Sequence, residues 1–106
     1  MPVARIVVPA AAKQGEIINI RALFQHPMET GYRRDHMGSP IPRHIIKTFA
    51  AVYNGVEIFR ADMTQGIAAN PYFAFSTVAT ESGEMTFTWT DDHGAAHSEK
   101  TRIKVV

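Results

Sequence analysis

The stretch MTFTWT, residues 85–90, determines how the rest of the chain is interpreted. Large apolar side chains alternate in it with threonines, so its hydrophobic period is two residues. That is the period of a β-strand with one face against a core and the other in water. The stretch therefore predicts a strand whose Met85, Phe87 and Trp89 side chains point into a core.

Short runs of β-branched and aromatic residues recur on both sides of this strand, separated by Gly, Pro, Asn and Asp. Asn54-Gly55 joins two of the runs and favours the positive φ angles of a type I′ hairpin turn. The other predicted strands are residues 5–8, 16–24, 45–53, 56–63 and 73–79, and a last strand containing 102–105. Seven short strands in about 100 residues predict an all-β fold, an immunoglobulin-like antiparallel β-sandwich of about seven strands.

The size and composition of the chain restrict its possible functions. Its 106 residues fit a single domain, 1–106. The absence of cysteine from these residues excludes disulfides, thiolate catalysis and cysteine-bound metals. The formal charge of +1 lacks the basic surplus of a nucleic-acid binder. No stretch approaches the roughly 20 apolar residues of a membrane-spanning helix, and the first residues do not have the pattern of a signal peptide.

No residue pattern indicates catalysis. Asp91 and Asp92 are neighbours in a predicted turn, where aspartate caps the backbone, whereas a catalytic carboxylate pair must converge from separate elements. The serines lie in no nucleophile-elbow pattern, and there is no glycine-rich phosphate loop. We therefore expect a protein that is not an enzyme, with no catalytic residues and no cofactor.

Five histidines and five methionines leave a metal-binding alternative open. Under this alternative the chain is a periplasmic His/Met metal-binding β-sandwich, and His93 and His97 are the first residues to test. The sequence has no HxH or HExxH pattern, and methionine also fills gaps in cores and interfaces. We therefore favour structural or surface histidines and assign no metal ligands.

Two long irregular connections, residues 26–43 and 64–71, interrupt the strand pattern. Loops of this length in a small domain are often functional, and their aromatic, arginine and methionine residues are typical of protein interfaces. The alternative is that the first segment merely covers one open end of the sandwich. The candidate partner-binding residues are His26, Pro27, Met28, Tyr32, Arg33, Arg34, Ile41, Asn70, Pro71 and Tyr72.

Several of these segments together resemble the SoxZ family, the small subunit of the SoxYZ sulfur carrier. They are HPMETG (26–31), IPR (41–43), YNG (53–55), ANPY (69–72) and WTDDHG (89–94). The resemblance implies an immunoglobulin-like subunit that forms a heterodimer with SoxY in thiosulfate oxidation. SoxY carries sulfur intermediates on a cysteine in a flexible C-terminal arm, and other Sox enzymes load, oxidise and hydrolyse them in transient contacts.

The resemblance also implies a periplasmic location, reached by co-export with a signal-bearing partner. A chain without cysteine that ends in Lys104-Val105-Val106 is not expected to be the arm-bearing subunit. Arg33 and Arg34 could attract the anionic sulfur adduct or an acidic enzyme face, or could simply be solvated charges. The isolated subunit could pair with itself through an uncovered apolar sheet face. A free-standing adhesion or chaperone-like module is a further alternative, and the sequence leaves open which sheet face or edge binds a partner.

Overall fold

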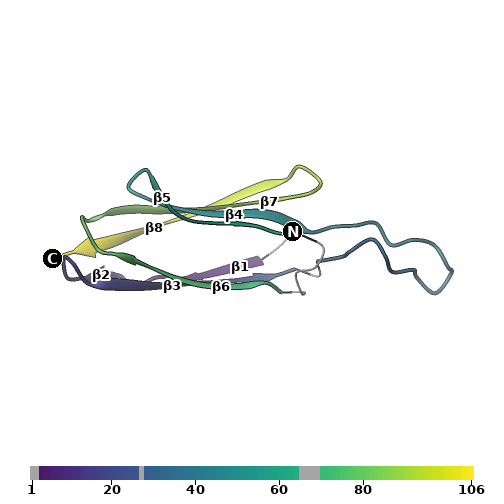
Figure 1. Ribbon diagram of the computed structural model, residues 1–106, viewed down its shortest axis with the longest axis horizontal. Helices are drawn as coiled ribbons and strands as arrows, with labels where there is room; N and C mark the ends of the chain where they lie inside the picture. Colours follow the sequence, from purple (N-terminus) through teal and green to yellow (C-terminus); the bar gives the residue numbers. More distant parts are fainter. Residues whose placement is uncertain (1–2, 27, 65–69) are drawn as a thin grey trace.

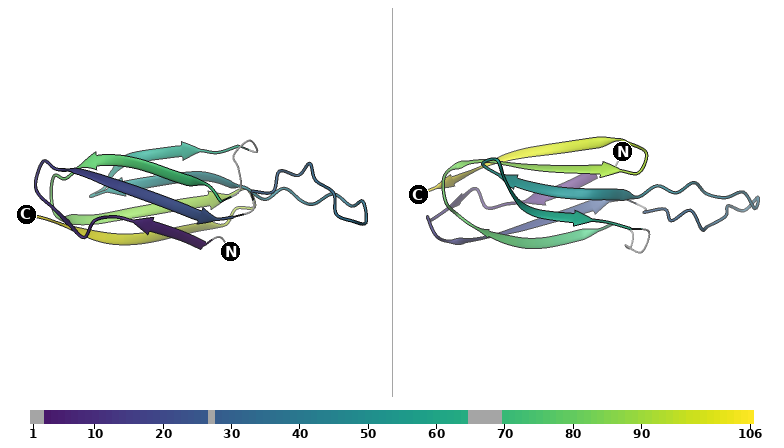
Figure 2. Two further views of the ribbon diagram at one scale, coloured as in Figure 1. Left: turned by 90° about the horizontal axis from the view of Figure 1, so that it is seen from below. Right: turned by 45° about the horizontal axis from the view of Figure 1, so that its top comes forward.

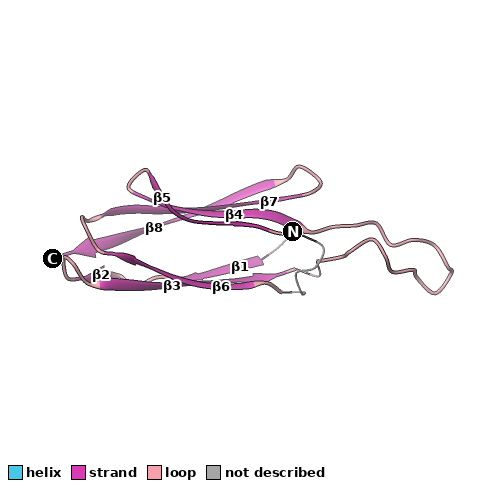
Figure 3. Ribbon diagram, viewed as in Figure 1, coloured by secondary structure: helices cyan, strands magenta, loops and turns pink. Residues whose placement is uncertain are grey.

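The computed structural model describes residues 3–26, 28–64 and 70–106. Two β-sheets lie one above the other, with strands running along the long axis (Figure 1). The described residues contain no helix (Figure 3), and therefore none that could cross a membrane. The strands are β1 (Val3–Val7), β2 (Ala11–Ala12), β3 (Ile17–Gln25), β4 (Ile46–Tyr53), β5 (Val56–Asp62), β6 (Tyr72–Val78), β7 (Gly83–Asp91) and β8 (Ala96–Val105).

The smaller sheet has the strand order β1-β3-β6, with antiparallel pairing throughout. In β3, buried and exposed side chains alternate without interruption, because every second residue is apolar and faces the other sheet. The buried residues of this strand are Ile18, Ile20, Ala22 and Phe24. The opposite, outer face of the sheet is exposed.

The larger sheet has the order β2-β8-β7-β4-β5. The central strand β7 contains the alternating stretch MTFTWT, and its Met85, Phe87 and Trp89 side chains are buried as the sequence predicts. The short strand β2 pairs with the end of β8 in parallel, so one pair departs from the predicted antiparallel arrangement. β4 and β5 are joined by Asn54-Gly55, with φ angles of 48° and 82°, which confirms the predicted hairpin.

Aromatic side chains from both sheets form the centre of the core. Phe24 of the smaller sheet contacts Phe49 and Trp89 of the larger sheet edge to face, with ring centroids 5.3 and 5.4 Å apart. Phe49 also stacks on Phe73, at 5.4 Å. Fully burying side chains of this size contributes about 2–3 kcal/mol each, so these contacts hold the sheets together in a chain without disulfides.

The all-β sandwich of about seven strands is confirmed, with small differences at the strand ends. All seven predicted strands are present, and an eighth, β2, consists of two alanines that give no alternating pattern. The molecule measures 59 × 20 × 18 Å, and its radius of gyration of 16.3 Å exceeds the roughly 13 Å of a compact domain of this length. A projecting loop accounts for this elongation (Figure 1).

Candidate partner-binding site

The projecting segment, which we call the long loop, is residues 28–45 between β3 and β4. It extends beyond the end of the sandwich opposite the C-terminus in all three views (Figures 1 and 2). Glu29 and His44 exchange two backbone hydrogen bonds of 2.7 and 2.8 Å near its base. Near its tip, the amide of Asp35 donates to the carbonyl of Ser39 at 2.9 Å. The long loop is therefore a narrow hairpin that is stabilised mainly by its own backbone.

A glycine allows the two sides of this hairpin to approach each other. Gly31 has a φ of 87°, and a Cβ atom there would lie 3.1 Å from Cβ of Arg43 on the opposite side. Both the left-handed backbone and the close contact favour glycine at this position. Gly31, the last residue of the HPMETG segment, is thus required by the backbone geometry of the long loop.

Asp92 attaches the base of the long loop to the end of β7. Its carboxylate accepts hydrogen bonds from the backbone amide of Ile45 at 3.0 Å and from Nε of Arg43 at 2.8 Å. Burial acts to raise the pKa of Asp92, but the bonds from Ile45 and Arg43 outweigh it and hold that pKa below its ordinary value. The carboxylate is therefore stabilised in its charged form.

Asp91 makes the corresponding contacts with its own turn and with His44. Its Oδ1 accepts hydrogen bonds from the amides of His93 and Ala95, both at 2.9 Å, and its Oδ2 lies 3.0 Å from Nε2 of His44. Burial acts to raise the pKa of Asp91, yet these bonds together lower it. Asp91 caps the turn as predicted, but it also ties that turn to the long loop.

Three histidines that are far apart in the sequence meet at this base. The rings of His26 and His44 are 4.6 Å apart edge to face, and those of His44 and His93 stack at 4.4 Å. His26 is buried, and its Nδ1 accepts the amide hydrogen of Met28 at 2.9 Å. Burial and the neighbouring His44 lower the pKa of His26, which favours the neutral ring. The cluster was not predicted from the sequence.

The second predicted loop reaches the same base through Asn70. The amide of His26 donates to Oδ1 of Asn70 at 3.0 Å, and the amide of Asn70 donates to the carbonyl of His26 at 2.7 Å. Asn70 has a φ of 53°, a conformation that asparagine tolerates better than most residues. Residues 65–69 lie outside the described part of the chain.

The candidate partner-binding residues differ in their exposure to solvent. His26, Met28 and Pro71 are buried and support the surface from behind. Ile41 is half-buried, whereas Tyr32, Arg33, Arg34, Asn70 and Tyr72 are exposed. Pro27 lies outside the described residues. The exposed members remain candidates for direct contact with a partner.

The two adjacent arginines have different environments. Arg33 forms a bidentate pair with Glu29, in which its Nε lies 3.0 Å from Oε2 and its terminal nitrogen 2.5 Å from Oε1. This contact raises the pKa of Arg33 and lowers that of Glu29. Arg34 donates only to the carbonyl of Gly38, at 2.8 Å, so its charge has no carboxylate partner among the described residues.

The clustered acids and histidines do not form a metal site. In residues 3–26, 28–64 and 70–106, no three His, Cys, Asp or Glu side chains are grouped so that they could hold a metal ion. The Asp91, Asp92 and His44 side chains are instead engaged in the hydrogen bonds described above. The arrangement positions the long loop, and nothing in its geometry favours the metal-binding alternative.

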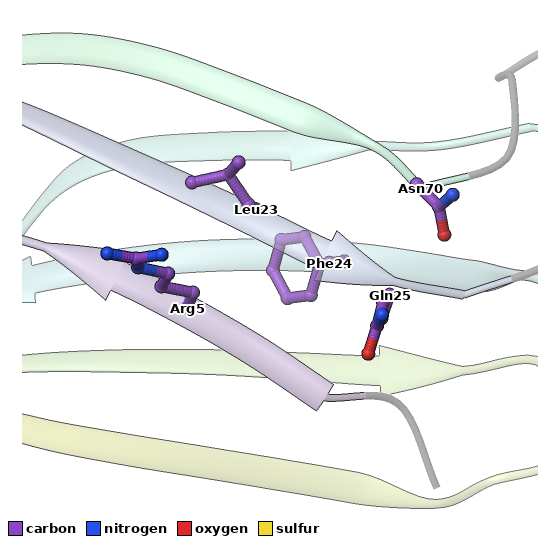
Figure 4. Close-up of a pocket in the computed structure, with 5 residues that line it drawn as sticks. All are labelled: Arg5, Leu23, Phe24, Gln25 and Asn70. Atoms are coloured by element: carbon purple, nitrogen blue, oxygen red, sulfur yellow. The ribbon is translucent and has the colours of Figure 1, made fainter.

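A hollow of about 370 Å³ opens on the smaller sheet beside this base (Figure 4). It is lined by Arg5 of β1, by Leu23, Phe24 and Gln25 of β3, and by Asn70. Of these residues, the sequence analysis singled out only Asn70 as a site residue. The outward positions of the predicted strands could have indicated Leu23, because a large apolar side chain is unexpected on a solvated face.

Solved structures of similar fold include superoxide reductases and a sulfur carrier protein. The superoxide reductase (neelaredoxin) from Ignicoccus hospitalis superposes with a TM-score of 0.75 at 19% identity, covering 97% of this chain and 80% of that one. A putative superoxide reductase from Thermotoga maritima has a TM-score of 0.74 at 14% identity, covering 97% and 85%. The sulfur carrier protein SoxY from Chlorobium limicola f thiosulfatophilum has a TM-score of 0.67 at 9% identity, covering 97% and 78%. At these identities the likeness concerns the fold alone.

Sequence comparisons identify the family. No curated protein matches the chain. The family model of the sulphur oxidation protein SoxZ matches residues 5–102, which is nearly the whole chain. This match spans both sheets and the long loop, and it agrees with the resemblance of the HPMETG and WTDDHG segments. The chain belongs to the SoxZ family of sulphur oxidation proteins.

Proposed function

We propose that this chain is the non-catalytic subunit of a SoxYZ sulfur carrier in thiosulfate and sulfur oxidation. In this complex it forms a heterodimer with a cysteine-bearing SoxY subunit and helps to present the sulfur-loaded arm of SoxY to other Sox enzymes. The observation that carries the proposal is the SoxZ family match over residues 5–102. The complex would operate in the periplasm after co-export with its signal-bearing partner.

The chemistry of the chain supports a role through a partner. Its 106 residues contain no cysteine on which a sulfur intermediate could be carried. The Asp91, Asp92 and His44 side chains at the base of the long loop are engaged in structural hydrogen bonds. A subunit with this composition would contribute binding surfaces, and the thiol would come from SoxY.

The long loop is the candidate surface for the transient contacts. It projects from the sandwich, and its Tyr32 and Met37 side chains are 79% and 78% exposed. Large exposed apolar and aromatic side chains on a loop held by a rigid base are suited to recognition of another protein. Arg34 adds a positive charge for an anionic adduct or an acidic enzyme face.

Co-expression with the SoxY subunit tests this proposal. We expect the two chains to co-purify and native mass spectrometry to give the mass of a 1:1 complex. Intact-mass analysis after thiosulfate loading should place the added sulfur mass on SoxY only. Two chains that separate freely on a sizing column, or sulfur bound covalently to this chain, would contradict the proposal.

A further inference from the structure

The outer face of the smaller sheet carries a patch of exposed apolar side chains. Of the eight large apolar side chains that are exposed in the described residues, four lie on this face: Ile17, Leu23, Tyr72 and Val78. The strand register pairs Leu23 with Tyr72 and Ile17 with Val78, so they form two cross-strand pairs near opposite ends of the face. An apolar group of this kind on a small domain commonly marks a binding surface.

Two arginines without ionic partners accompany this patch. Arg5 lies opposite Leu23, and Arg21 lies opposite Val7, so the arginines are diagonal neighbours on the same face. Neither arginine makes an ion pair or a side-chain hydrogen bond with any described residue, in contrast to Arg33, Arg43 and Arg60. Two guanidinium groups beside exposed apolar side chains provide anchors of the type enriched at protein interfaces.

No acidic side chain balances these charges on the described part of this face. The outward residues other than the four apolar ones are Arg5, Val7, Asn19, Arg21, Gln25, Ala74 and Ser76. The face is therefore positively charged, with apolar side chains near both of its ends. A complementary surface would place carboxylates opposite the arginines.

The face is also hollowed at the position of the arginines. The hollow of about 370 Å³ is lined by Arg5 and Leu23, and a second one of about 260 Å³ is lined by Arg5, Val7, Arg21, Leu23 and Tyr72. Figure 4 shows Arg5 and Leu23 on neighbouring strands at the first hollow. Side chains of a partner could enter these depressions, the second of which is lined by both arginines.

The outer face of the larger sheet has a different character. Its central strand presents Thr86, Thr88 and Thr90 outward. Some of its charged residues are paired: Nη1 of Arg60 lies 3.3 Å from Oε1 of Glu57, and Nζ of Lys100 lies 3.9 Å from Oε1 of Glu84. Carboxylates therefore accompany the basic residues on this face, which also include Arg102 and Lys104. A threonine-covered face with charges of both signs is well suited to water, so it is the poorer candidate for a permanent interface.

We propose that the outer face of the β1-β3-β6 sheet is the permanent interface with the SoxY-type carrier subunit. This inference rests on the proposed function and adds the location of the interface. The matching surface of the partner carries apolar side chains that cover Leu23 and Tyr72, flanked by carboxylates that pair with Arg5 and Arg21. The long loop remains outside this interface and is available to other proteins.

Binding measurements on surface variants of the co-expressed complex test the location. Leu23→Glu and Arg21→Glu should each weaken the complex about 30-fold or more. Leu23→Glu places a charge in a covered apolar contact, and Arg21→Glu replaces a cation with a charge that repels the carboxylates of the partner. Thr88→Glu and Arg102→Glu introduce the same charges on the outer face of the larger sheet and should leave the affinity within about threefold of wild type. Circular dichroism and thermal melting of each variant confirm that it is folded.

Salt dependence gives a second measurement that does not depend on an added carboxylate. The wild-type affinity should fall between about 50 mM and about 500 mM NaCl, because screening weakens the pairs between arginines and carboxylates. The Arg5→Gln, Arg21→Gln double variant should bind more weakly at low salt and show a smaller salt dependence. An unchanged salt dependence in the double variant would overturn the assignment of acidic partner groups.

The two proposals fail in different ways. If wild-type protein does not bind the carrier subunit, the proposed function fails. If wild-type protein binds but Leu23→Glu and Arg21→Glu bind equally well, the location is wrong and the heterodimer stands. Loss of binding in Thr88→Glu and Arg102→Glu alone would move the interface to the larger sheet.

Discussion

The side-chain carbonyl of Asn54 occupies the space that a Cβ atom on Gly83 would need. A Cβ built on Gly83 would lie only 1.7 Å from Oδ1 of Asn54. The same oxygen accepts the amide hydrogen of Glu84 at 3.1 Å, and the amide of Asn54 donates to the carbonyl of Glu84 at 3.0 Å. The β4–β5 hairpin is therefore fixed to the start of β7 through a position that only glycine fits without displacement.

Gly83→Ala should destabilise the protein by about 1–3 kcal/mol, because the added methyl group displaces Asn54 from its bonds with Glu84. Urea unfolding followed by tryptophan fluorescence measures the loss. In an Asn54→Gly background, which keeps the positive φ and removes the obstructing side chain, Gly83→Ala should cost less than half as much. Equal costs in the two backgrounds would show that the contact does not limit this position.

Asp92→Ala should loosen the long loop and lower the free energy of unfolding by about 1–3 kcal/mol. The substitution removes the acceptor for the Ile45 amide and the ionic partner of Arg43. Hydrogen exchange should show faster exchange at the amides of Glu29 and His44, which hold the base of the loop. Asp62→Ala is the control, since Asp62 is exposed and pairs only with Arg60 at 3.6 Å; it should leave these amides unchanged.

Stability should fall as the solution is acidified below about pH 6.5. The pKa of His26 is lower in the folded protein than its ordinary value of 6.5, so the unfolded chain binds the proton first and acid favours unfolding. The contribution is complete above pH 6.5 and is lost as the pH falls towards the pKa in the folded state. A second loss should begin near pH 3.8, where the lowered pKa values of Asp91 and Asp92 act in the same direction.

His26→Asn separates these two acid effects. Asparagine can still accept the amide hydrogen of Met28, but it does not titrate, so the loss between pH 6.5 and 5 should become smaller while the loss near pH 3.8 remains. Thermal melting across this pH range gives the comparison. An unchanged slope between pH 6.5 and 5 in the variant would show that protonation of His26 does not cause this loss of stability.

Charge reversal at Arg33 and Arg34 should slow sulfur loading or unloading about tenfold while the heterodimer stays intact. Both side chains lie on the long loop, away from the proposed interface, and steering by surface charge changes association rates more than the stability of a distant contact. Arg34→Glu alone should account for most of the effect, because the charge of Arg33 is already paired with Glu29. Loss of the heterodimer in either variant would instead place these arginines in the permanent interface.

The sheets could be predicted from the sequence because their signals are local. The alternation in residues 85–90 and the Asn54-Gly55 pair each determine the conformation of their own segment, and both predictions are confirmed. The contact of Gly83 with Asn54 could not be predicted in this way. It depends on the register between β4 and β7, which the packing of both sheets decides.

The candidate site was predicted only in part, for the same reason. The long loop was recognised from its composition, but the clustering of His26, His44 and His93 requires both ends of the β3–β4 connection to meet the β7–β8 turn at one end of the sandwich. The pairing of β4 with β7 also shifts register between Ile46 and Thr48, next to this cluster. Spacing along the chain carries no information on such a shift, so His93 and Asp91 could not be placed beside the long loop.

The elongated shape of the molecule has a consequence for the order of events in a carrier complex. With a long dimension of 59 Å and the hairpin projecting at one end, the two proposed docking positions, at the tip of the long loop and on the flank of the sandwich, lie apart from each other. An enzyme that engages the tip need not displace a subunit already seated on the flank. Successive enzymes could therefore exchange at one end of the molecule while its companion stays in place.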